Sequence, residues 1–110
     1  MTSPDVPAEL PEIEPHEAHR RIAAGALHVD VREPDEFARV RIEGAMLLPL
    51  SEFSNRFEEL PHDREIVVSC RSGARSGRAT AFLRERGYDA VNLGGGILAW
   101  EEEGLSVERD

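Results

Sequence analysis

Short apolar runs alternate along the chain with amphipathic segments, and proline or glycine marks most of the junctions. The apolar runs are too short for helices and are dense in Val, Ile and Leu, which is typical of buried strands. They predict strands at residues 27–31, 45–49, 65–69 and 91–93.

The segments between these strands predict helices. Residues 15–24 begin with Pro15 and stop at Gly25, and residues 76–86 stop at Gly87 with Ala79, Phe82 and Leu83 as the buried stripe. Three further helical segments are predicted: a turn at 34–37, a helix at 52–60 capped by Ser51, and a helix at 97–103 that ends at Gly104. Because strands and helices alternate, the fold class is α/β, with a central parallel sheet covered by helices on both faces.

Length and charge limit the organisation and the partners. The 110 residues indicate one domain at 12–110, preceded by a flexible tail at 1–11 that carries three prolines. A formal net charge of −9 argues against nucleic acid and anionic membranes as partners, and charges interrupt every apolar stretch before it could span a bilayer. A single cysteine and no secretory leader pattern predict a cytoplasmic protein.

Cys70 is that single cysteine, and it lies where a parallel sheet binds ligands, just past the end of a strand. The turn that follows it contains Gly73 and opens into a helix, so its amides can form a cradle for an anion and lower the pKa of the thiol. Arg71 and Arg75 add positive charge at the rim, where either could hold a dianion. A buried structural cysteine is the alternative, but it would need neither the glycine turn nor the arginines.

Four stretches together resemble a single-domain rhodanese over residues 12–105: DVREPDEF (30–37), RIEGAMLLPL (41–50), CRSGARS (70–76) and NLGGGILAW (92–100). The resemblance implies a rhodanese-like fold and transfer of a sulfane sulfur, without a cofactor, from thiosulfate or a similar anion to cyanide or a thiol. It implies a persulfide on Cys70, and it places Asp30 and Arg32 near the loop as support. It also implies a loop that holds the outer sulfur, made of Arg71, Ser72, Gly73, Ala74, Arg75 and Ser76.

The chain departs from the family at 40–45, where Arg41 stands in place of a frequent histidine. We expect this segment to lie away from the nucleophile and to affect local packing or partner contacts. Phosphatases and arsenate reductases of the same fold place five residues between cysteine and arginine, whereas four separate Cys70 from Arg75. The smaller cradle favours sulfur chemistry, and a non-catalytic regulatory module remains a further alternative.

The remaining candidates are weaker. His16 and His19 lie one helical turn apart without the other ligands of a metal motif, so no metal site is predicted. Residues 94–96 are interpreted as a plain turn, and Trp100 as a core residue of the last helix, with a place at the rim of the site as the alternative. With no second cysteine, the sulfur acceptor must be external: cyanide, a small thiol or a protein thiol. We expect a monomer or a weak dimer.

Overall fold

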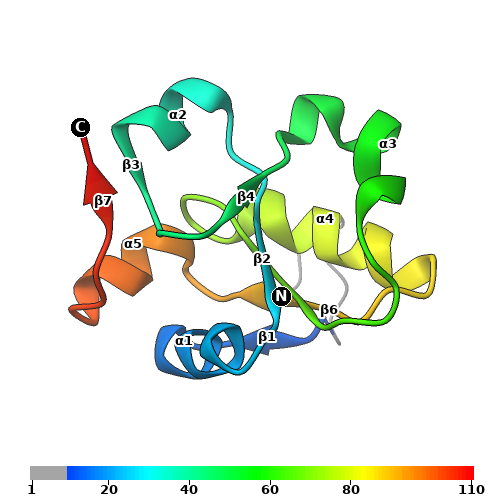
Figure 1. Cartoon of the computed structure of the whole chain (residues 1–110), viewed down its shortest axis with the longest axis horizontal. Coiled ribbons are helices and arrows are strands. Elements are labelled where there is room, and N and C mark those ends of the chain that lie inside the picture. The colour runs from blue at the N-terminus through cyan, green and yellow to red at the C-terminus, as the bar shows by residue number, and fades with distance from the viewer. Residues whose placement is uncertain (1–9) are drawn as a thin grey trace.

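A computed structural model of the chain describes residues 10–110 and contains a five-stranded parallel sheet (Figure 1). Across the sheet the strands are ordered β1 (Glu12–Ile13), β6 (Ala90–Leu93), β5 (Ile66–Ser69), β2 (Leu27–Asp30) and β4 (Met46–Leu47). Every pairing in this sheet is parallel. The predicted α/β fold with a central parallel sheet is therefore confirmed.

Helices lie on both sides of this sheet, as the alternating pattern predicts. One side carries α1 (Pro15–Ala23) and α5 (Gly96–Glu102), and the other carries α3 (Phe53–Arg56) and α4 (Ala74–Glu85). The short helix α2 (Pro34–Arg39) has no buried residue and follows β2 after residues 31–33. None of the described helices is long and apolar enough to cross a membrane.

The sheet divides the apolar core into two clusters, and β5 contributes side chains to both of them. Ile66 and Val68 face the cluster under α3 and α4, whereas Val67 faces the cluster under α1 and α5. Successive residues of a strand point to opposite faces, so a strand that is buried on both sides is apolar throughout. Trp100 is only 3% exposed and packs in the second cluster, which confirms its predicted place in the core.

Three two-residue strands were not predicted, because they are too short to show a period. They are β1 and the antiparallel pair β3 (Val40–Arg41) and β7 (Glu108–Arg109). The predicted tail at 1–11 lies mostly outside the described residues, but the Pro11 carbonyl accepts a hydrogen bond of 2.9 Å from the Asn92 amide. The described part of that tail is thus attached to the sheet.

The predicted helix at 52–60 and its Ser51 cap are wrong in detail. The segment is divided into η1 (Leu50–Glu52), α3 and η2 (Phe57–Glu59), and Ser51 lies within η1. The Ser51 hydroxyl donates a 2.8 Å hydrogen bond to Glu33 instead of capping a helix. A long-range acceptor has outcompeted the local capping role.

Candidate active site

The carboxyl ends of three neighbouring strands bring the site together. Arg32 follows β2, Cys70 follows β5, and the three glycines at 94–96 follow β6. Because the strands are parallel, all three ends lie at one edge of the sheet, where α/β proteins bind their ligands. Residues from three separate parts of the sequence are thus gathered around one thiol.

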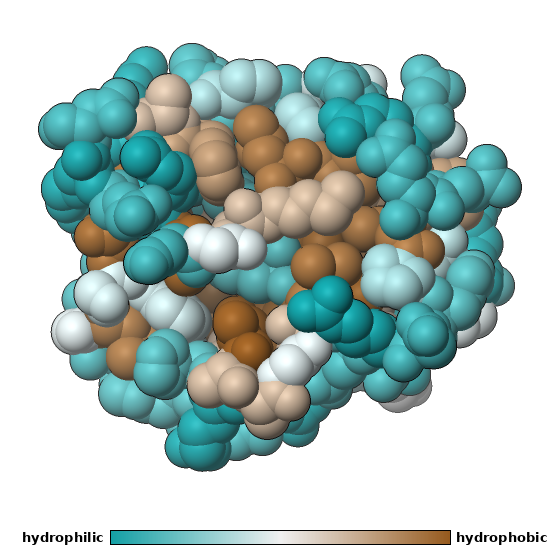
Figure 2. All heavy atoms as spheres, in the orientation of Figure 1, coloured by the Kyte–Doolittle hydropathy of each residue, from teal (hydrophilic) through white to brown (hydrophobic). Residues whose placement is uncertain are grey.

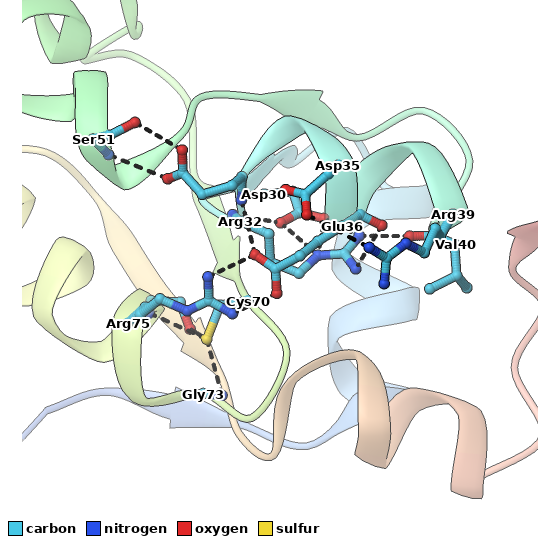
Figure 3. Close-up of polar contacts among 12 residues, drawn as sticks. Asp30, Arg32, Asp35, Glu36, Arg39, Val40, Ser51, Cys70, Gly73 and Arg75 are labelled. Atoms are coloured by element: carbon cyan, nitrogen blue, oxygen red, sulfur yellow. Dashed lines mark hydrogen bonds and ion pairs between the residues drawn. The ribbon is translucent and has the colours of Figure 1, made fainter.

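The loop after Cys70 curls back so that its amides point at the sulfur (Figure 3). The Gly73 amide lies 3.1 Å from Sγ, and the Ser76 amide and hydroxyl each lie 3.4 Å from it. Gly73 has a φ of +100°, a conformation that favours glycine, and it caps α4. Helix α4 therefore begins at Ala74, two residues before the predicted start, so its first turn belongs to the cradle.

These contacts shift the pKa of Cys70, which is only 1% exposed. Burial raises the pKa of the thiol, but the hydroxyl and amide of Ser76 and the amides of Gly73 and Ser72 lower it by more. The pKa of Cys70 therefore lies below its ordinary value. The predicted amide cradle and its effect on the thiol are both present.

Helix α5 fixes the other side of the loop. The Ile97 amide donates to the Cys70 carbonyl at 2.9 Å, and the Leu98 amide donates to the Arg71 carbonyl at 3.2 Å. A Cβ on Gly96 would lie 2.4 Å from the Arg71 oxygen and 2.5 Å from the Cys70 oxygen. The glycines at 94–96 are thus more than a plain turn, because they let the α5 amides hold the loop carbonyls.

Asn92, at the end of β6, is a member of the site that sequence reasoning missed. Its amide nitrogen donates to the Gly73 carbonyl at 3.1 Å and to Glu12 at 2.9 Å, and its oxygen accepts the Ser76 hydroxyl at 2.6 Å. Asn92 is fully buried, so this one side chain holds two residues that contact the sulfur. A lone asparagine within the apolar run AVNL was the available signal.

Asp30 and Arg32, expected as support for the loop, form a buried ion pair. The guanidinium makes contacts of 2.8–3.1 Å with the Asp30 carboxylate, and both residues are 2% exposed. Arg32 also donates to the carbonyls of Val40, at 2.7 Å, and Glu36, at 3.4 Å. The pair therefore anchors α2 and the segment after it, and acts on the loop through them.

Arg75, expected at the rim as an anion ligand, is held by Glu36 of α2 (Figure 3). The two contacts measure 2.7 and 2.8 Å, and the bond from Arg75 holds the pKa of Glu36 at about 2. Arg71 is exposed, and no described residue pairs with its guanidinium. Of the two arginines expected at the rim, Arg71 is therefore the one without a partner among residues 10–110.

The other expected residues lie as follows. Ser72 and Ala74 are exposed at the loop, whereas Ser76 is buried beside the sulfur. His16 lies 3.3 Å from Glu103, and His19 packs against the Trp100 ring. At one end of the segment 40–45, which was expected to lie away from the nucleophile, Val40 lines a cavity together with Arg71, the residue after Cys70.

Comparison with known proteins identifies the class of fold and site. The family model of the rhodanese-like domain matches residues 14–103, and the chain belongs to this family. A sulfurtransferase of Allochromatium vinosum is 43% identical over 87% of the chain and 92% of that protein. The thiosulfate sulfurtransferase GlpE of Actinobacillus succinogenes is 34% identical, covering 88% of the chain and 89% of that protein.

A solved structure agrees with the sequence comparisons. A rhodanese-related protein of Thermoplasma volcanium superimposes with a TM-score of 0.86 at 33% identity, over 91% of the chain and 99% of its own. The sulfurtransferase names of the relatives support a rhodanese-type enzyme.

Proposed function

We propose that the protein transfers a sulfane sulfur from thiosulfate or a similar anion to an external acceptor through a persulfide on Cys70. The observation that carries the proposal is the placement of Sγ within 3.1–3.4 Å of the Gly73 and Ser76 amides, at the start of α4. Such amides stabilise a thiolate and, after transfer, the negative outer sulfur of a persulfide.

The first half-reaction forms one S–S bond and breaks another. The Cys70 thiolate attacks the outer sulfur of thiosulfate, and sulfite leaves with the electron pair of the broken bond. In the second half-reaction, cyanide or a thiolate attacks the outer sulfur of the persulfide, and the electron pair returns to Sγ. The chain has no other cysteine, so the acceptor is external.

The loop length supports this reaction over the alternatives. Four residues separate Cys70 from Arg75, and the Arg75 guanidinium is already held by Glu36. A phosphatase-type reaction needs a wider loop and an arginine that binds the phosphoryl group. We therefore expect negligible hydrolysis of an aryl phosphate.

Mass spectrometry of the intact protein after thiosulfate treatment tests the proposal. The wild type should gain one sulfur atom and lose it on addition of cyanide, which yields thiocyanate. Cys70→Ser should neither gain sulfur nor form thiocyanate while it unfolds at a similar temperature, because serine is nearly isosteric. Thiocyanate formation by Cys70→Ser at the wild-type rate would refute the role of Cys70, and an unreactive wild type would favour a regulatory module.

A further inference from the structure

A cavity of about 290 Å³ lies between α2 and α5, beside the cysteine loop. Helix α5 contributes Ile97 and Leu98 to its lining, and Arg71 contributes from the loop itself. The Ile97 and Leu98 amides bind the Cys70 and Arg71 carbonyls, so one wall of the cavity is hydrogen-bonded to the backbone of the cysteine loop.

The cavity has an excess of positive charge, although the whole chain is acidic. Its two acids are already paired, Glu36 with Arg75 and Glu101 with Arg109. Arg71 has no partner among the described residues, and Arg39 is 77% exposed with only a 3.6 Å contact to Asp35. Two guanidinium groups are thus available at the rim for an anionic ligand.

The same cavity has an apolar wall, formed by Val40, Ile97 and Leu98. Leu98 is 39% exposed and is the one exposed large apolar side chain among residues 10–110. Apolar residues also gather over the middle of the face drawn in Figure 2, to the right of α2 and α5, with hydrophilic residues around them. Neither cyanide nor thiosulfate has an apolar part that could use such a wall, and both are much smaller than the cavity.

We propose that this cavity binds the sulfur acceptor, and that the acceptor is a small thiol with a carboxylate on an aliphatic body. The carboxylate lies against Arg39 and Arg71, and the aliphatic part lies against Val40, Ile97 and Leu98. The thiolate then attacks the outer sulfur of the Cys70 persulfide, the bond to Sγ breaks, and the electron pair stays on Sγ. This inference rests on the proposed function, since it requires a persulfide on Cys70.

The test compares two thiols that differ only at the end remote from sulfur, 3-mercaptopropionate and 3-mercapto-1-propanol. With thiosulfate saturating, kcat/KM for each acceptor is measured at equal thiolate concentration. The wild type should prefer the carboxylate, and Arg39→Glu should reduce that preference roughly three- to tenfold, because an attraction is replaced by a repulsion at an exposed site. The wild-type preference should also fall as salt is added.

Two controls separate this inference from the proposed function. Arg20→Glu is the matched control: it makes the same change of charge on α1, at an arginine that also pairs with an acid of its own helix, Glu17. It should leave the preference for the carboxylate thiol unchanged. Arg20 lies outside both the cavity and the cysteine loop, so Arg20→Glu should also transfer sulfur to cyanide at the wild-type rate. Equal use of the two thiols by the wild type, or an equal effect of both variants, would overturn the acceptor site. Failure of cyanide transfer in the wild type would instead refute the proposed function.

Discussion

Replacing Gly96 by alanine tests whether α5 holds the cysteine loop in place. Gly96 has a φ of +61°, where a side chain costs about 1–2 kcal/mol. An added Cβ would also lie 2.4–2.5 Å from the carbonyl groups of Cys70 and Arg71, which are backbone atoms and cannot rotate away. The loop and α5 must therefore separate.

The cost of that separation can be worked from the contacts that are lost. Two hydrogen bonds join α5 to the loop, from the Ile97 and Leu98 amides, and each contributes about 0.5–1.5 kcal/mol net. Together with the backbone strain, Gly96→Ala should lower the free energy of unfolding by about 2–5 kcal/mol. It should also abolish most sulfur transfer, because the displaced carbonyls carry Cys70 with them.

Gly104→Ala is the matched control, since Gly104 has a φ of +81° but no atom within 4 Å of an added Cβ. It should show the backbone strain alone, about 1–2 kcal/mol, with normal activity. Urea unfolding and thiocyanate formation, measured on both variants, check the reasoning. An equal loss of stability in the two variants, with activity retained in Gly96→Ala, would refute it.

Three further predictions concern residues around the loop. Ser76→Ala should raise the pKa of Cys70, so alkylation of the thiol by iodoacetamide at neutral pH should slow and its pH profile should move to higher pH. Arg32→Met should cost about 3–5 kcal/mol in urea unfolding, because it leaves the buried Asp30 carboxylate without its partner, and adding Asp30→Asn should recover part of the loss. Burial holds the pKa of His28 at about 4, below its ordinary 6.5, so the unfolded chain binds the proton first as the pH falls. The free energy of unfolding should therefore drop by on the order of 3 kcal/mol between about pH 6.5 and pH 4, and His28→Gln should remove this part of the slope.

The sheet and the nucleophile could be predicted because their signals are local. The run EIVVS has no competing interpretation, and Cys70 directly follows it beside a glycine turn that opens into a helix. Neighbouring residues thus determine both the place of the thiol and the direction of its pKa shift. The cradle found around Sγ consists of the amides that the loop sequence supplies.

The partners of the loop could not be predicted, because they are distant in sequence. Glu36 and Arg75 are separated by 39 positions, and Arg75 was expected to bind the substrate anion because it adds positive charge at the rim of the cradle. Asn92 and Gly96 also act through contacts that only the sheet order creates. The three successive glycines at 94–96 were nevertheless a signal that another backbone segment approaches closely. The interpretation of these residues as a plain turn overlooked that signal.

The contacts of the loop explain how a small basic island can work in an acidic protein. Helix α5 holds the carbonyls of Cys70 and Arg71, Asn92 holds that of Gly73, and Glu36 holds the side chain of Arg75. Because these carbonyls and the Arg75 side chain are held, the loop amides already point at the sulfur. The loop therefore need not reorganise when negative charge moves from Sγ to the outer sulfur of the proposed persulfide. Amides do not titrate, and Glu36 keeps its charge down to a pH of about 2. In the proposed reaction, the pH dependence near neutrality therefore belongs to Cys70 and to the acceptor thiol rather than to the groups that hold them.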